Sequence, residues 1–402
     1  MLLRKIYYRA YQLVFKIAAN FLGINEPEVL SDVRALEAIP KLLKTYNLTR
    51  PLLVSDNGIH ELGLLNPLFE LLKKNDIGFA YFHDVVANPT ITNVNDGLKV
   101  FEENLCDSII VVGGGSAMDC AKMIGAVYVN KGKNVEDLKG LLKVKKALPF
   151  LIAIPTTSGT GSETTLAAVI VNEKTHHKYA INDPHLIPKF AVLDPNLTLA
   201  LPPKITSTTG MDALTHAVEA FIGHSNTKKT KEAAIEAIKL IDQNLLICYK
   251  DGKNLEARKN MQKAAYLAGV AFTRAYVGYV HAIAHSLGGK YNVPHGLANA
   301  IILPYVLEYY GKSVYSKLAI ISDELSLCEK SCKKQEKAKA FIDYVRKLNS
   351  EMEIPQKFDI SYNELEVSEM IDNAFKEGNP LYPVPKEFSK EDFRRIYRKI
   401  LL

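Results

Sequence analysis

The sequence predicts an α/β nucleotide-binding domain followed by an all-helical domain. In the first half, short apolar runs such as SIIVV (108–112) alternate with segments of helical periodicity. This alternation is typical of βαβ units around a parallel sheet. Near residues 194–203 an Asp-Pro turn and a Pro-Pro pair interrupt the pattern, and the segments that follow are almost all helical. The chain has 402 residues, which is enough for two such domains.

The individual elements follow from these patterns, and they divide the chain into three parts. Strands are predicted at 51–56, at 77–82, and at the apolar starts of 108–116 and 150–163. Helices are predicted at 62–74, 94–104 and 118–129, and after the boundary at 207–223, 229–248, 254–276, 278–287, 296–309, 313–325, 334–348 and 363–376. The three parts are an N-terminal amphipathic helix (1–24), an α/β dinucleotide-binding domain (25–198) and an all-helical catalytic domain (199–402).

The composition is that of a soluble globular protein. Hydrophobic residues make up 48% and charged residues 23% of the chain, which argues against disorder and against a multi-span membrane protein. The net charge of +6 comes from scattered residues without a basic stripe, so nucleic-acid binding is not expected. Five cysteines at irregular spacing predict a reducing, cytoplasmic setting. We expect Cys328 and Cys332 to be unrelated helical thiols.

The N-terminal segment combines positive charges with apolar residues. Arg9 and Lys16 interrupt the apolar run and no small-residue cleavage site follows, which argues against a signal peptide. We expect an amphipathic helix that packs on its own domain or on a neighbouring subunit, with attachment to a membrane surface as the alternative. No window is long enough to span a bilayer. The predicted apolar face consists of Tyr7, Tyr8, Tyr11, Leu13, Val14, Phe15 and Ile17.

A glycine-rich loop follows the predicted strand at 108. Gly113, Gly114, Gly115 and Ser116 stand between this strand and a helix, where free backbone N–H groups and the helix dipole favour a pyrophosphate. The motif is neither GxGxxG nor a P-loop, and a glycine turn after a strand is often only a tight turn.

A second loop, PTTSGTGSE, follows the strand at 150. The hydroxyls of Thr156, Thr157, Thr160 and Ser162 are candidates to bind phosphate, ribose or carboxamide groups, or alternatively to cap the next helix. Two such loops at strand ends of one open sheet predict a nucleotide site. Asp56 ends the first strand and is either a ribose ligand, which would favour NAD over NADP, or part of a turn with Asn57 and Gly58.

Two later segments predict a metal site. Asp212 and His216 stand four residues apart on a predicted helix, and His281 and His285 repeat this spacing. His295 follows a Gly-Gly break and begins another helix. Oxygen and nitrogen donors without sulfur suit Fe²⁺, Zn²⁺, Mn²⁺ or Co²⁺. The spacing leaves five candidates and does not select among them.

Together these segments resemble the iron-containing (group III) alcohol dehydrogenase family. GGGSAMD, PTTSGTGSE, TGMDALTHAVEAF and GYVHAIAHSLGGKYNVPHGLAN stand in the family's order and spacing, and the resemblance covers residues 25–390. It implies the dehydroquinate-synthase-like fold, with an α/β nucleotide-binding domain, an all-helical domain, and the metal in the cleft between them. It also implies a homodimer and a small alcohol or aldehyde as substrate.

The resemblance implies roles for individual residues. It implies that Asp212, His216, His281 and His295 bind Fe²⁺, with Zn²⁺ as the alternative, and that His285 lies free near the substrate. Asp119 stands where the family has an acidic residue close to the cofactor. The positions implied to contact the cofactor are Asp56, Gly114, Gly115, Ser116, Thr156, Thr157 and Lys178.

Two segments depart from the family pattern. Arg274 and Tyr276 stand where smaller or uncharged residues are commoner, and NPLYPVP (379–385) replaces the more usual Asn-Pro-Arg ending. Both departures bear on the substrate pocket. We therefore leave the alcohol open among short primary alcohols, diols and hydroxy acids.

The predicted reaction is reversible hydride transfer between an alcohol and NAD. A divalent ion lowers the pKa of an alcohol hydroxyl, the nicotinamide carries the hydride, and we expect His285 to relay the proton. The alternatives are a glycerol-dehydrogenase-like or dehydroquinate-synthase-like enzyme of the same fold, which the HAIAH…PHGLAN segment disfavours, and an inactive nucleotide-binding protein.

Overall fold

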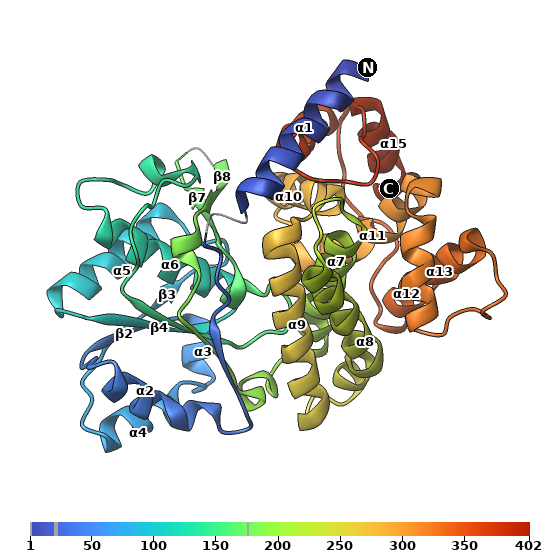
Figure 1. The fold of residues 1–402 in the computed structure, drawn as a ribbon. Helices are drawn as coiled ribbons and strands as arrows, with labels where there is room; N and C mark the ends of the chain where they lie inside the picture. Colours follow the sequence, from blue (N-terminus) through green and yellow to red (C-terminus); the bar gives the residue numbers. More distant parts are fainter. Residues whose placement is uncertain (1, 20–22, 175–176) are drawn as a thin grey trace. The chain divides into compact units, whose positions relative to one another are not determined.

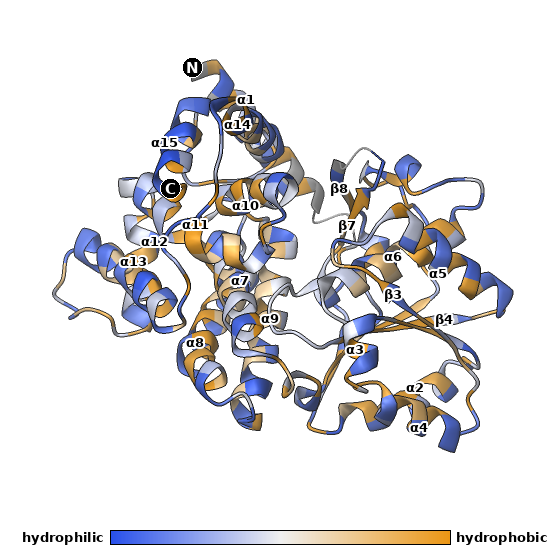
Figure 2. Cartoon of the chain, turned by 180° about the vertical axis from the view of Figure 1, so that it is seen from behind, coloured by the Kyte–Doolittle hydropathy of each residue, from blue (hydrophilic) through white to orange (hydrophobic). Residues whose placement is uncertain are grey.

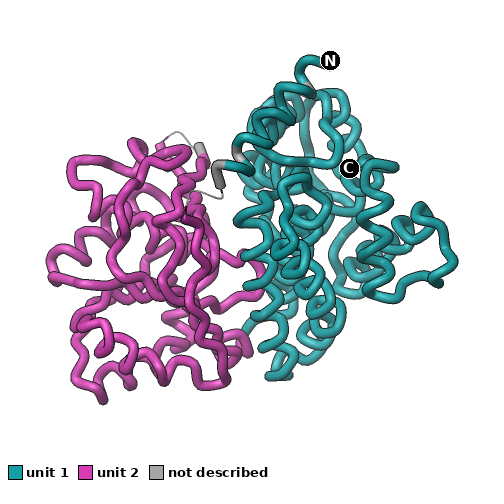
Figure 3. Tube along the Cα trace, in the orientation of Figure 1, with its two compact units in different colours: residues 1–21, 201–402 teal, residues 22–200 magenta. Residues whose placement is uncertain are grey.

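The computed structural model describes residues 2–19, 23–174 and 177–402. These residues form two compact units (Figure 3). The first, Leu22–Ala200, is called the α/β unit here. The second combines Met1–Phe21 with Leu201–Leu402 and is called the helical unit. Among the described residues, no helix is both long and apolar enough to cross a membrane.

The α/β unit is built on a parallel sheet, as the sequence predicts. Within the described residues six strands pair in the order β1-β9-β6-β4-β2-β3, all parallel. The chain moves outward from β2 to β3 and then returns to the other side of β2 to form β4. Open α/β sheets bind ligands at the carboxyl ends of strands where the order reverses in this way. The strands are β1 (Glu28–Ser31), β2 (Pro51–Asp56), β3 (Ala80–Val85), β4 (Ser108–Gly113), β6 (Phe150–Pro155) and β9 (Phe190–Leu193).

Helices cover both faces of this sheet (Figure 1). Ile109 and Val111 of β4 join the core on the side of α5 and α6, whereas Ile110 and Val112 join the core on the side of α2 and α4. This two-sided burial explains why β4 reads as an unbroken apolar run, drawn in orange in Figure 2. The helices of the unit are α2 (Ile39–Thr45), α3 (Asn57–Glu61), α4 (Asn66–Lys74), α5 (Ile91–Glu103) and α6 (Gly115–Val129).

A second, smaller sheet is not predicted by the sequence. Strand β8 (His177–Asn182) pairs with β7 (Ala167–Asn172) in antiparallel fashion and with β5 (Gly140–Leu141) in parallel fashion. Strand β7 (AAVIVN) is an apolar run that the sequence prediction passed over, whereas β8 (HKYAIN) begins and ends with polar residues and gives a weaker signal. The sheet matters because it carries Lys178.

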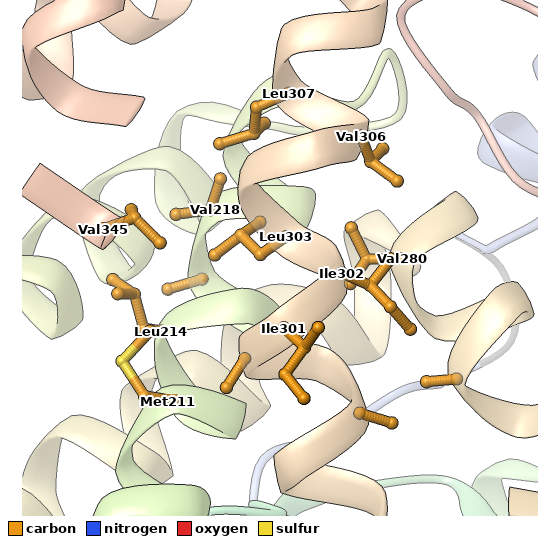
Figure 4. Packing of buried hydrophobic residues seen from close by; sticks show 14 of the residues in the cluster. Met211, Leu214, Val218, Val280, Ile301, Ile302, Leu303, Val306, Leu307 and Val345 are labelled. Atoms are coloured by element: carbon orange, nitrogen blue, oxygen red, sulfur yellow. The ribbon is translucent and has the colours of Figure 1, made fainter. Parts of the chain in front are cut away.

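The helical unit buries its apolar residues around α11. Figure 4 shows side chains of α7, α10 and α13 packed against this helix. The labelled residues are Met211, Leu214, Val218, Val280, Ile301, Ile302, Leu303, Val306, Leu307 and Val345. The helices are α1 (Leu2–Ala19), α7 (Pro203–Ile222), α8 (Lys228–Lys250), α9 (Leu255–Ala275), α10 (Tyr279–Tyr291), α11 (His295–Tyr310), α12 (Tyr315–Glu324), α13 (Lys334–Glu351), α14 (Glu364–Gly378) and α15 (Lys390–Ile400).

The predicted helices and strands are present, with shifts at several ends. Strand β3 begins at Ala80 rather than 77, and the segment predicted as one helix over 62–74 is a turn followed by α4. Helix α15 is not predicted, because charged residues dominate its sequence and leave only a narrow apolar stripe. That stripe, Phe393, Ile396, Tyr397 and Ile400, is buried.

Helix α1 packs on the helical unit. The buried Gln12 donates hydrogen bonds to the carbonyl oxygens of Pro380 and Tyr382, both at 2.9 Å. These contacts match one of the two packing arrangements predicted for the segment, that on its own domain. Four residues of the predicted apolar face, Tyr7, Leu13, Val14 and Ile17, remain exposed. The side chain of Phe15, and residues 1 and 20–22 of the predicted segment, lie outside the described part of the chain.

The prediction for Cys328 and Cys332 is wrong, because the two residues form a disulfide. They lie in a turn between α12 and α13 rather than in a helix, and their Cα atoms are 6.4 Å apart, within bridging range. Cys106, Cys120 and Cys248 are free and buried. The cysteine content is therefore no argument for a reducing compartment.

Candidate metal centre and cofactor loops

Three helices of the helical unit carry the predicted metal ligands. Asp212 and His216 lie one turn apart on α7, whose start is set by Pro203 at its first position. His281 lies on α10. Helix α10 ends where Asn292 adopts left-handed backbone angles (φ 53°), and after Pro294 the next helix begins at His295.

The structure brings four predicted ligands together. One ligand atom from each of Asp212, His216, His281 and His295 lies within 4.8 Å of the others. Oδ1 of Asp212 is 3.5 Å from Nε2 of His295 and 3.9 Å from Nε2 of His281. Asp212, His216 and His281 are buried, and His295 is partly exposed. Three imidazoles and one carboxylate that converge in this way fit a divalent transition metal ion.

A buried carboxylate orients one of these histidines. Oε2 of Glu219 lies 2.6 Å from Nδ1 of His281 and accepts a hydrogen bond from the backbone N–H of Gly278 (2.8 Å), while Oε1 accepts from that of Val280 (2.8 Å). A histidine that donates from Nδ1 to a carboxylate leaves Nε2 free to bind a metal. Burial raises the pKa of Glu219 to about 8, against the effect of its hydrogen bonds. Burial and the neighbouring imidazoles lower the pKa of His281 well below its usual value.

Asn299 is a second residue of this centre that sequence reasoning missed. Its fully buried side chain places Nδ2 2.6 Å from Oδ1 of Asp212 and 3.1 Å from Nε2 of both His281 and His295. Asn299 follows His295 by one helical turn, and Glu219 follows His216 by three residues. This helical spacing is the signal that could have identified both.

His285 lies beside the cluster but has its own carboxylate. Nδ1 of His285 is 2.6 Å from Oε1 of Glu377, and the same oxygen accepts a hydrogen bond from the hydroxyl of Tyr382 at 2.7 Å. The His285 ring stacks on that of His295, with centroids 5.1 Å apart. Tyr382 belongs to the NPLYPVP segment (379–385), so this segment reaches the predicted catalytic histidine through Glu377.

The two predicted cofactor loops face each other in the α/β unit. A Cβ atom on Gly115 would lie 3.0 Å from the side chain of Thr160, and one on Gly114 would lie 3.6 Å from that of Thr157. The backbone N–H of Thr156 donates to the carbonyl oxygen of Gly113 at 3.1 Å. Helix α6 begins at Gly115, so its first N–H groups lie at this junction.

Asp56 lies beside the glycine loop at the adjacent strand end. Its Oδ1 accepts from the backbone N–H of Ile59 (2.9 Å) and caps α3, as the turn interpretation predicts. A Cβ atom on Gly113 would lie 3.7 Å from its Oδ2 and 2.6 Å from Cβ of Ala117, which explains the need for glycine there. Asp56 can cap α3 and also contact a cofactor, because Oδ1 makes the cap and Oδ2 lies on the side of the glycine loop.

Lys178 and Ser116 meet at Asn88. Nζ of Lys178 donates to Oδ1 of Asn88 (2.8 Å), and the backbone N–H of Asn88 donates to Oγ of Ser116 (3.2 Å). Asn88 has a left-handed backbone (φ 58°) in the sequence ANPT, a turn signal that the sequence reasoning did not use. This turn joins the small sheet to the glycine loop.

Asp119 and Lys122 anchor the second loop to α6. Asp119 accepts hydrogen bonds from Oγ of Ser162 and from the backbone N–H of Val169, both at 3.0 Å. The fully buried ammonium of Lys122 donates to oxygens of Ser162, Thr165 and Ala167 at 2.8–3.1 Å. Burial raises the pKa of Asp119 and lowers that of Lys122 to about 8. Both oxygens of Asp119 bind protein groups, so the structure gives it a role in holding the loop.

Comparison with known proteins identifies the family of the chain. Residues 27–195 match the family model described as iron-containing alcohol dehydrogenase, and residues 206–401 match the C-terminal model of the Fe-containing alcohol dehydrogenase family. Alcohol dehydrogenase 4 of Schizosaccharomyces pombe is 39% identical over 86% of this chain and 82% of its own. The 1,3-propanediol dehydrogenase of Citrobacter freundii is 37% identical over 94% of this chain and 96% of its own.

A solved structure shows the same fold. The crystal structure of a 1,3-propanediol oxidoreductase superposes with a TM-score of 0.90, at 35% identity, over 94% of this chain and 99% of that one. Both halves of the sequence and the whole matched fold thus agree with one family. The chain belongs to the iron-containing alcohol dehydrogenase family.

Proposed function

We propose that the chain catalyses reversible hydride transfer between a small alcohol or aldehyde and NAD at a metal held by Asp212, His216, His281 and His295. Family membership makes it an oxidoreductase of the alcohol dehydrogenase type. The observation that carries the proposal is the convergence of one carboxylate and three imidazoles within 4.8 Å. We propose Fe²⁺ as the ion, with Zn²⁺ as the alternative, because the donor set accepts either.

The chain's own residues prepare the site for this chemistry. A divalent ion, when bound, lowers the pKa of an alcohol hydroxyl and polarises a carbonyl, and the nicotinamide supplies the hydride transfer. Glu219 holds Nδ1 of His281 and so directs Nε2 into the ligand cluster. His285 is proposed to relay the proton, because it lies beside the ligands and is partly exposed to solvent.

The two loops of the α/β unit support the proposed NAD site. Gly113, Gly114, Gly115 and Ser116 present the start of α6, where backbone N–H groups favour a pyrophosphate. Thr157 and Thr160 lie against Gly114 and Gly115, and Thr156 bonds Gly113 through its backbone. Lys178 is linked to Ser116 through Asn88, and Asp119 holds the second loop in place. The free oxygen of Asp56 favours a ribose diol and disfavours a 2′-phosphate, which supports NAD over NADP.

The substrate is proposed to be an uncharged short alcohol, diol or aldehyde. Two of the matched proteins are named for 1,3-propanediol. The carboxylate of Glu377 next to His285 would repel a hydroxy acid at this position. Among the substrate classes that the sequence leaves open, this disfavours the hydroxy acids.

The remaining predictions stay proposals. They are the three-part division at 1–24, 25–198 and 199–402, a homodimer, and a cytoplasmic location. Among the described strands β1 pairs with β9 alone, and its outer edge supports the homodimer proposal, since an exposed edge can pair with a second chain.

The proposed function is tested by metal analysis and turnover of the purified protein. We expect bound iron or zinc, and NADH formation from short alcohols that a chelator abolishes and added Fe²⁺ or Zn²⁺ restores. NADP should support slower turnover. The Asp212→Ala and His281→Ala variants should lose the metal and the activity together, whereas Glu236→Gln, a surface change on α8, should retain both.

Two outcomes would overturn the proposal. Metal-loaded protein that binds NAD but converts no alcohol or aldehyde would be an inactive nucleotide-binding protein. Metal that remains bound in both ligand variants would place the site elsewhere.

A further inference from the structure

We propose that Glu377 is the positioning residue of His285, and that helix α1, through Gln12, holds the chain segment that keeps Glu377 in place. The N-terminal helix would then be part of the active-site support. This inference rests on the proposed role of His285 in proton transfer. The spectroscopic test described below does not depend on that role.

His281 and His285 carry matching carboxylates. They lie one turn apart on α10, and each has Nδ1 2.6 Å from a glutamate oxygen, of Glu219 and Glu377 respectively. A neutral imidazole that donates from Nδ1 has an unprotonated Nε2. For His281 this nitrogen faces the metal ligands. For His285, which is not in the ligand cluster, the same tautomer provides a nitrogen that can accept a proton.

Glu377 needs support of its own. The side chains of His285 and Glu377 are about one-third exposed, so water competes for their hydrogen bond. Tyr382 supplies the support by donating its hydroxyl to the same Oε1 at 2.7 Å. Burial and the nearby Glu377 carboxylate raise the pKa of Tyr382 well above its usual value, so the hydroxyl keeps its proton. Tyr382 follows α14, and its N–H donates to the carbonyl oxygen of Gly378.

Helix α1 fixes the backbone around Tyr382. Both donor bonds of the Gln12 amide go to this segment, to the carbonyl oxygens of Pro380 and Tyr382 at 2.9 Å. Its Oε1 accepts from Arg9 (2.9 Å), and Lys16 donates to backbone carbonyls of His224 and Asn226. Gln12 is thus a fully bonded, buried amide that links α1 to the residues following α14.

Helix α1 lies outside the part of the chain that the family models match. Those models cover residues 27–195 and 206–401, whereas α1 ends at Ala19. The segment it holds is NPLYPVP (379–385), which follows α14 and carries Tyr382. A helix outside the family models therefore supports the segment that holds Glu377.

The first test compares turnover of Glu377 variants in the metal-loaded, full-length enzyme. We expect Glu377→Ala to lower kcat by about 100-fold, and Glu377→Gln, which can still accept the hydrogen bond, by about tenfold. Tyr382→Phe should lower kcat less than Glu377→Ala does. KM and metal content should stay near those of the wild type. The control Glu369→Gln removes only a surface pair on α14 and should change neither constant.

The second test observes His285 directly and needs no substrate. Long-range ¹⁵N–¹H correlation spectra of histidine-labelled, Zn²⁺-loaded protein should show the Nδ1–H form of His285. Glu377→Ala should abolish this preference, and Glu377→Gln should retain it. The same tautomer in wild type and Glu377→Ala would overturn the role of Glu377, whether or not the enzyme turns over alcohols.

The third test concerns the helix. Gln12→Met keeps the side-chain length but lacks both donors, and we expect about a fivefold lower kcat with bound metal unchanged. In the Gln12→Met/Glu377→Ala double variant the helix change should add almost nothing, because both act through His285. Val14→Ala, an exposed change on the same helix, is the control. Additive effects, or full activity of Gln12→Met, would overturn the role of α1.

Discussion

Glu219 contacts Nδ1 of His281, the ring nitrogen on the side away from the other metal ligands. Replacing it with alanine removes the group that sets this tautomer and leaves two buried backbone N–H groups, of Gly278 and Val280, without their acceptor. We expect metal affinity to fall by about 10- to 100-fold in Glu219→Ala, measured by competition with a coloured chelator. Glu219→Gln should lose less, since its amide oxygen can still accept. Equal affinity in all three proteins would contradict the assigned role.

Gly115 allows the two loops of the α/β unit to approach. In Gly115→Ala the new Cβ atom would lie 3.0 Å from Thr160, so the loops must separate where the pyrophosphate is proposed to bind. We expect a weaker NAD complex, by about tenfold, with bound metal unchanged, measured by nucleotide fluorescence titration. Gly78→Ala, where a Cβ meets nothing within 4 Å, is the matched control. Unchanged NAD affinity would argue that the cofactor lies elsewhere.

At the scale of whole elements, the second loop, PTTSGTGSE, is held in place by one buried group, the ammonium of Lys122. Its ammonium reaches three residues of the segment 162–167 and lies near the Asp119 and Glu163 carboxylates. Lys122→Met would leave these acceptors and charges without their partner. We expect a loss of about 3 kcal/mol in the free energy of unfolding, together with faster amide exchange over 162–169. Lys99→Met, which breaks an exposed pair on α5, should change little.

The elements show which features a sequence can predict. Most of the buried parallel strands and the long helices were predictable, because apolar runs and helical spacing are local signals. Helical spacing supplied five candidate metal ligands, and only the family resemblance selected four of them. The small sheet, β1, β9, α2 and α15 were missed. Strands β7 (AAVIVN) and β9 (FAVL) are apolar runs that were passed over, whereas α15 is missed because charged residues dominate its sequence and its stability comes from packing.

Non-local partners set a second limit on prediction. Glu377 lies 92 residues from His285, and no local pattern relates them. Glu219 and Asn299 are different, because their helical spacing from His216 and His295 offers a signal. The cysteine prediction failed for a local reason instead, since Cys328 and Cys332 are only four residues apart and the turn that joins them was predicted as helical.

Across the whole molecule, metal binding should stabilise the folded state. The four ligands come from α7, α10 and α11, which share one apolar core, so an ion that binds only the assembled cluster favours the folded form. At a free metal concentration 100-fold above Kd we expect about 2.7 kcal/mol of added stability. Thermal unfolding with and without chelator measures this effect. An equal shift in an Asp212→Ala/His281→Ala protein would show that the stabilising ion binds elsewhere.

The packing of α1 also constrains the order in which the chain can fold during synthesis. Gln12 and the carbonyl oxygen it contacts at Pro380 are 368 residues apart. At about 5–20 residues per second, a ribosome needs about 20–70 s to make the rest of the chain. The amphipathic segment therefore emerges long before its partner, while the α/β unit behind it can already fold. The side of the helix that carries Gln12, which is buried in the folded chain, would be open to chaperones or to the helix of another nascent chain throughout that interval.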